Sequence, residues 1–102
     1  MIHEIFQLGG PNLAAIPRQV VVAWSELLEA LHTRDELRRR LANTKERPEI
    51  LAYWTEWAAE VSENIRRLVG QIDAFMEEAR RLELAMPHDM STAWTALKER
   101  AS

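Results

Sequence analysis

The stretch from Pro48 to Met86 constrains the fold of this chain more than any other feature. Apolar residues return in it every three or four positions, in ten steps that cover 36 residues. A mean spacing of 3.6 is that of a straight α-helix, whereas a strict 3.5 repeat would supercoil. The sequence therefore predicts one long amphipathic helix, about 48–86, which Pro87 ends. Its inward positions are Ile50, Trp54, Trp57, Val61, Ile65, Leu68, Ile72, Phe75, Ala79, Leu82 and Met86.

The apolar face of this helix is wide. Leu51, Ala58, Val69 and Met76 lie beside the inward stripe and extend the apolar arc to roughly 140°. An arc of that width exceeds a two-helix seam and predicts contact with two other helices. Gly70 falls on the outer face, where it could permit a bend or a break.

A first helix is predicted to begin at Pro17, a residue suited to the first helical position. Thr33 and Glu36 then match a capping box, which predicts that the helix breaks or bends near Thr33 and restarts over 34–43. The buried stripe of this region comprises Val20, Trp24, Leu27, Leu28 and Leu31, followed by Leu37 and Leu41.

The polar connection 43–47 is short enough to make the flanking helices antiparallel neighbours. A last short helix is expected over 92–100, capped by Asp89 or Ser91, with Met90, Trp94 and Leu97 spaced to pack on the bundle. Residues 1–16 are interpreted as an N-terminal arm, packed over the core or exchanged with a second subunit. Residues 17–102 form the helical domain, and the chain has one domain overall.

The predicted fold class is therefore all-α: an elongated antiparallel helical hairpin. A helix of that length measures about 55 Å, whereas a compact globule of this size has a radius of gyration near 13 Å. Two such hairpins would bury their apolar arcs in a four-helix bundle, so we expect a homodimer. The alternative is a monomer whose ends fold back over the exposed flank. The expected oligomer or partner interface comprises Leu51, Trp54, Trp57, Val61, Ile65, Leu68, Val69, Ile72, Phe75 and Met76.

One basic cluster stands out in a chain whose formal net charge is −3. It consists of Arg38, Arg39, Arg40, Lys45 and Arg47, which surround the turn between the helices. In one interpretation these cations complement a helix C-terminus and a solvated loop. In the other they form a docking patch for nucleic acid or for an acidic protein surface.

Chemistry-bearing motifs are weak. Glu29 and His32 have the Glu-x-x-His spacing of di-iron bundles, but the helical register points both away from the core, so no metal, cofactor or catalytic residue is expected. The chain has no cysteine for a disulfide or a thiolate site. Its first residues lack the basic segment of a signal peptide, and no window approaches the roughly 18 apolar residues of a membrane span. We therefore expect a cytoplasmic protein that is not an enzyme and does not enter a membrane.

The overall format is similar to that of the small secreted WXG100 helical-hairpin proteins: about 100 residues, acidic, cysteine-free, with two long helices. That family carries Trp-x-Gly in its turn, whereas the turn here is Asn43-Thr44-Lys45-Glu46-Arg47 and Trp24-Ser25-Glu26 falls inside a helix. The family's tyrosine-based secretion signal also has no match near Arg80-Arg81-Leu82-Glu83. Our leading hypothesis is an adaptor, regulator or assembly component acting by protein–protein interaction. The alternatives are a nucleic-acid-associated regulator and a WXG100-like secreted hairpin.

Overall fold

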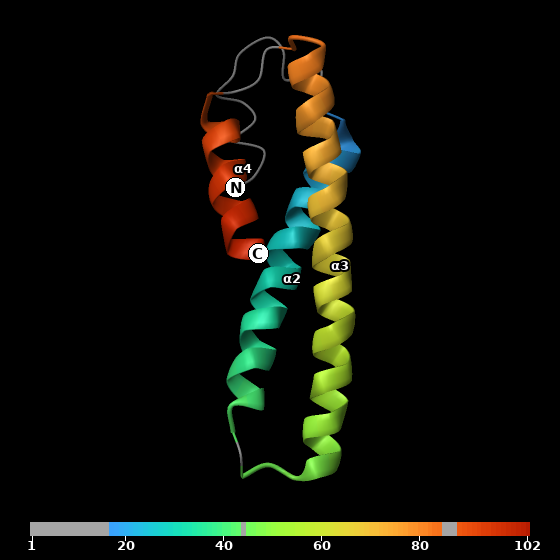
Figure 1. Cartoon of the computed structure of the whole chain (residues 1–102), viewed down its shortest axis with the longest axis vertical. Helices are drawn as coiled ribbons and strands as arrows, with labels where there is room; N and C mark the ends of the chain where they lie inside the picture. Colours follow the sequence, from blue (N-terminus) through green and yellow to red (C-terminus); the bar gives the residue numbers. More distant parts are fainter. Residues whose placement is uncertain (1–16, 44, 85–87) are drawn as a thin grey trace.

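The structure is a computed structural model that describes residues 17–43, 45–84 and 88–102. These residues form three α-helices and no strand: α2 (Arg18–Leu41), α3 (Pro48–Arg81) and α4 (His88–Ala101). The first two helices run antiparallel as a long hairpin, and α4 lies beside the half of the hairpin that is far from its turn (Figure 1). The predicted all-α hairpin is confirmed. Within the described ranges, no helix is long and apolar enough to cross a membrane.

Helix α2 is continuous from Arg18 to Leu41, so the break predicted near Thr33 is wrong. Pro17 is the N-cap residue and not the first helical residue as predicted, because the helix begins one position later, at Arg18. Two contacts explain why the helix passes through the apparent capping box. Arg34 is buried and donates hydrogen bonds to the end of α4, and the carboxylate of Glu36 pairs with Arg39 on the next turn. Packing here overrides a local capping signal.

Helix α3 begins as predicted, with Arg47 as N-cap, Pro48 in the first turn and Glu49 near the positive end of the helix dipole. It passes through Gly70 without a break. Because Gly70 is exposed and has open space where a Cβ would stand, this glycine serves no packing purpose in the described fold.

The long helix ends at Arg81, five residues before the predicted end. Glu83 adopts a left-handed backbone with φ of 56°, and two amides turn back to close the helix. The Leu84 amide donates to the Ala79 carbonyl at 2.9 Å, and the Glu83 amide donates to the Arg80 carbonyl at 3.1 Å. This is the Schellman pattern, formed here without glycine. Leu82, predicted to face inward, is past the end of the helix and 53% exposed, and Met86 lies outside the described residues.

Helix α4 begins at His88, four residues earlier than predicted. Asp89 and Ser91, the two predicted caps, therefore lie inside the helix, where Asp89 occupies the first turn. Met90 lies in this added turn and is fully buried, and that burial stabilises the longer helix. The predicted packing positions are confirmed, because Met90, Trp94 and Leu97 are all buried.

The core lies where three helices meet, and among the described residues the other half is two helices thick. The described chain measures 54 × 23 × 20 Å and has a radius of gyration of 16.6 Å, above the roughly 13 Å of a compact globule of this length. Figure 1 shows α4 beside one half of α3, and burial along α3 follows this division. Its buried residues are Ile65, Leu68, Ile72 and Ala79, all in the half beside α4. Toward the turn, Trp54 and Val61 are half-buried and Trp57 is exposed.

Candidate functional site

The residues predicted to form an oligomer or partner interface fall into three groups. Three of them are buried within the single chain and build its own core: Ile65, Leu68 and Ile72. Another three are half-buried at the edge of that core: Val69, Phe75 and Met76. The remaining four lie nearer the turn and keep solvent contact: Leu51, Trp54, Trp57 and Val61. We call these four, together with Tyr53, the turn-proximal surface.

Aromatic side chains dominate the turn-proximal surface. Tyr53 is 62% exposed and Trp57 is 38% exposed, and their ring centroids are 6.2 Å apart. The guanidinium of Arg40 lies over the Trp54 ring, 5.5 Å from its centroid, as expected of a cation–π contact. A groove of about 610 Å³ runs beside Trp57 and Val61. Large apolar rings that stay in water despite a helical core are typical of binding surfaces.

The basic cluster surrounds the free end of the hairpin. All five members, Arg38, Arg39, Arg40, Lys45 and Arg47, are exposed. Arg39 pairs with Glu36, and Arg40 covers Trp54. Within the described part of the chain, the side chains of the other three have no carboxylate within 4 Å. The cluster is therefore a solvated cationic end of the hairpin. That it docks nucleic acid or an acidic protein surface stays a prediction from the sequence.

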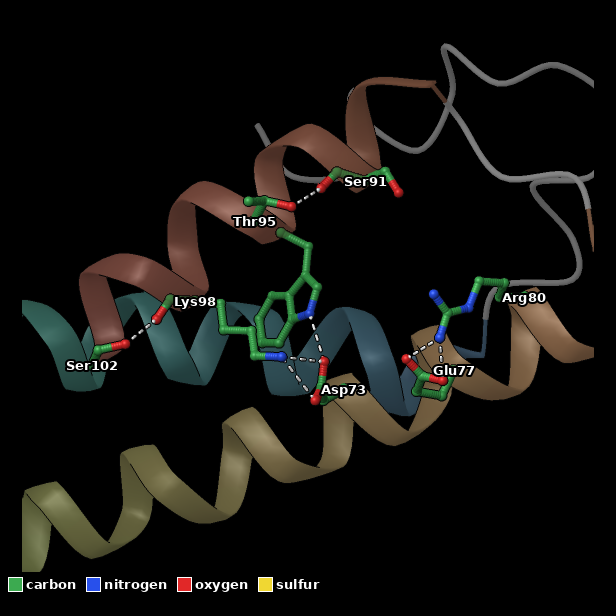
Figure 2. A network of polar contacts seen from close by, with 8 residues as sticks. Asp73, Glu77, Arg80, Ser91, Thr95, Lys98 and Ser102 are labelled. Atoms are coloured by element: carbon green, nitrogen blue, oxygen red, sulfur yellow. Dashed lines mark hydrogen bonds and ion pairs between the residues drawn. The ribbon is translucent and has the colours of Figure 1, made fainter.

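A polar network joins α3 to α4 in the opposite half of the molecule (Figure 2). The Trp94 indole N–H donates to Asp73 Oδ1 at 3.2 Å, and Lys98 Nζ donates to both carboxylate oxygens at 2.9 and 3.0 Å. These hydrogen bonds, from Lys98 first and Trp94 second, hold the pKa of Asp73 below its ordinary value. The Trp94 ring also packs on Trp24, with centroids 5.6 Å apart. Asp73 thus fixes the position of α4 on the hairpin.

The sequence analysis missed Asp73. The residue follows inward Ile72 and lies on the flank of the helix, where a charge is usually solvated. One signal was available: Trp94 and Lys98 are four positions apart and so share one face of the last helix. Nothing local in the sequence identifies Asp73 as the acceptor that this face meets.

Arg34 was also missed, and it holds the far end of α4. Its side chain is 7% exposed, and its guanidinium donates to the carbonyls of Arg100 at 2.6 Å and Ala101 at 3.2 Å. Arg100 in turn pairs with Asp35 at 3.0 Å. Burial first, and the neighbouring charge of Arg38 second, lower the pKa of Arg34. The arginine caps the unsatisfied carbonyls at the negative end of a helix.

The hydrogen bonds of Asp73 and Arg34 both join α4 to the hairpin. Glu29 and His32 are exposed, as the register predicts, and border the groove beside Trp57. Among the residues that the structure describes, no three His, Cys, Asp or Glu side chains gather within reach of one metal ion. The Asp73 carboxylate already accepts from Lys98 and Trp94. The arrangement is suited to holding helices and presenting surfaces.

The residues at which this chain departs from the WXG100 signature have structural roles here. Trp24 is 3% exposed in the middle of the core, and the turn contains no glycine. Asn43 shapes that turn instead, because its Oδ1 accepts the Lys45 amide at 3.1 Å. No family model matches this chain, and the comparisons with curated proteins and with solved structures likewise give no match.

Proposed function

We propose that this chain is a non-enzymatic interaction protein that pairs with a second copy of itself through the turn-proximal surface. The observation that carries the proposal is the exposed end of the apolar face of α3. Trp57 and Tyr53 are exposed, and Leu51, Trp54 and Val61 are half-buried, where the molecule is two helices thick. The wide apolar arc of this helix continues past the part that α4 covers.

An antiparallel arrangement of two hairpins suits this surface best. Overlap of the two turn-proximal halves would make a local four-helix bundle, which gives each apolar arc two neighbours. An antiparallel register also places the two basic clusters at opposite ends of the bundle, where the like charges stay apart.

The test is the molar mass in solution, measured by light scattering during size-exclusion chromatography. We expect a mass near twice 11.8 kDa for the unmodified chain. Trp57→Glu should return the mass to that of the monomer, because it places a charge in the centre of the surface. The matched control is Val22→Glu, since Val22 is 45% exposed and lies on α2 away from the turn. A monomeric unmodified chain, or an equal effect of both variants, would refute the homodimer.

A second candidate function rests on the basic cluster. Arg38, Lys45 and Arg47 extend into solvent without an ion-pair partner in the described part of the chain, at one end of the molecule. If this end binds nucleic acid, a labelled DNA or RNA strand should be retarded at low salt and released as salt rises. The triple change Arg38/Arg39/Arg40→Ala should abolish the shift. Arg80/Arg81→Ala, at the far end of α3 and also exposed, is the control, and it should leave the shift unchanged.

A further inference from the structure

A pocket rich in cations lies between α2, the middle of α3 and the end of α4. It has a volume of about 440 Å³, and we call it the cationic pocket. Four basic residues line it: Arg34, Arg38, Arg66 and Lys98. No Asp or Glu side chain belongs to its described lining, although the chain as a whole is acidic. Such a lining favours an anionic ligand over a cationic one.

The lining cations differ in how firmly they are held. Arg38 is exposed, and its side chain has no hydrogen bond or ion pair with the described residues. Arg66 pairs with Glu63 on its own helix, an exposed pair of the kind that contributes little and exchanges easily. Lys98 directs its ammonium to Asp73 (Figure 2), so it contributes at longer range. Arg38 and Arg66 are therefore the two guanidinium groups free to turn toward a ligand.

Arg34 supplies a second and independent indication. Its side chain is more than nine-tenths buried, and its Nε atom has no hydrogen-bond partner. Asp35 Oδ1 lies 4.0 Å from that nitrogen, which is an ion-pair distance but too long for a hydrogen bond. Burial first and the charge of Arg38 second lower the pKa of Arg34, and the carboxylate of Asp35 offsets part of this effect. An anion bound in the pocket would add an attractive charge beside this buried guanidinium and weaken the repulsion from Arg38.

We propose that the cationic pocket binds a small phosphate monoester, with Arg38 and Arg66 gripping the phosphate group beside Arg34. Guanidinium groups match phosphate oxygens in paired hydrogen bonds and favour a dianion over a singly charged carboxylate. Ile65 and Val69 form an apolar wall for the organic part of the ligand. The volume is within the roughly 300–1,000 Å³ of small-molecule sites, so the pocket suits a small molecule and not a polymer.

The test titrates the full chain with phenyl phosphate and, separately, with inorganic phosphate at constant ionic strength. Binding is followed by ³¹P NMR and by the melting temperature. We expect saturable binding of phenyl phosphate and a rise in Tm, because the ligand binds only the folded state. Arg38→Ala and Arg66→Ala should each weaken binding about fivefold or more, as expected on loss of a charged hydrogen bond. Arg34 is left unchanged because it also caps α4.

Two controls separate this site from general charge. Arg81→Ala removes an arginine that also pairs with a glutamate three positions away on α3 but lies outside the pocket. Lys45/Arg47→Ala removes cations of the basic cluster that do not line the pocket. Both variants should bind phenyl phosphate as tightly as the unmodified chain does, and this result is independent of the oligomeric state proposed above.

The outcomes are distinct. Tighter binding of phenyl phosphate than of inorganic phosphate supports an organic monoester, and equal binding supports a phosphate site whose ligand is the free ion. No saturable binding of either at millimolar concentration overturns the proposal. Equal weakening by Arg81→Ala and Arg66→Ala also overturns it, because the attraction would then be unspecific. A nucleic-acid strand that displaces phenyl phosphate and depends on Arg66 would assign the pocket to that polymer instead.

Discussion

At the scale of single residues, Gly70 lowers the stability of the helix that contains it. The glycine lies in the middle of α3, is exposed, and has no neighbouring atom within 4 Å of the place where a Cβ would stand. We expect Gly70→Ala to raise the free energy of unfolding by about 0.5–1 kcal/mol, because alanine loses less backbone entropy in a helix. Urea denaturation followed by circular dichroism measures this change. A loss of stability would show that this face of α3 needs the glycine for close contact.

Glu83 is a second residue whose type does not suit its backbone conformation. Its φ of 56° places a side chain in the left-handed region, which glycine occupies without strain. We expect Glu83→Gly to stabilise the fold by about 1 kcal/mol, because glycine has no Cβ to strain this backbone conformation, whereas Glu83→Ala should not, since alanine keeps the Cβ. Urea denaturation measures both variants. Equal effects would mean that the change in stability comes from loss of the Glu83 side chain and not from relief of backbone strain.

At the scale of elements, the position of α4 depends on Arg34. Its guanidinium is held by the last carbonyls of α4, beside the Asp35–Arg100 pair. We expect Arg34→Ala to cost about 2 kcal/mol of stability, because the helix end loses its donors and a buried stem is removed. Trp94 fluorescence should shift as α4 loosens, since Trp94 is buried against Trp24. Arg39→Ala, an exposed arginine five positions on in α2, should have little effect on either measurement.

The other contact that holds α4 should respond to acid. The pKa of Asp73 is lowered in the folded state, so the unfolded chain binds its proton at a higher pH than the folded chain does. The stabilisation is therefore complete above the unfolded pKa, near 3.9, and is lost as pH falls through the lower folded value. Asp73→Asn should remove this part of the acid dependence, seen in melting temperatures measured from neutral to acidic pH. An unchanged acid profile would place the dependence elsewhere, with Asp35 the next group to test.

These elements also show how far the sequence could predict the fold. Apolar spacing was sufficient for α3 and for the packing of Met90, Trp94 and Leu97, since helix periodicity is a local property. Helix boundaries were not predictable in the same way. Thr33 has the local sequence of a helix cap, but the contacts of Arg34 with α4 keep α2 continuous through it. The Arg34 and Asp73 contacts join residues 21 to 67 positions apart. No spacing rule along one helix can identify contacts of that kind.

At the scale of the whole molecule, the uneven thickness of the hairpin has a dynamic consequence. The half of α3 beside α4 contributes the buried residues Ile65, Leu68 and Ile72, whereas the half near the turn, 50–61, contributes half-buried and exposed ones. Helical amides with few buried contacts open at low free energy. In a dilute, monomeric sample, amides of 50–61 should therefore exchange with deuterium faster than amides of 65–79.

Raising the protein concentration separates the elongated monomer from the proposed homodimer. If two copies pair through the turn-proximal surface, exchange of 50–61 should slow as concentration increases, while that of 65–79 changes little, because its protection already comes from within one chain. Trp57→Glu should keep 50–61 fast at every concentration and so serves as the reference. Protection of 50–61 that is high and independent of concentration in both proteins would argue against the second copy. That result would indicate that the two-helix half is stable without a partner.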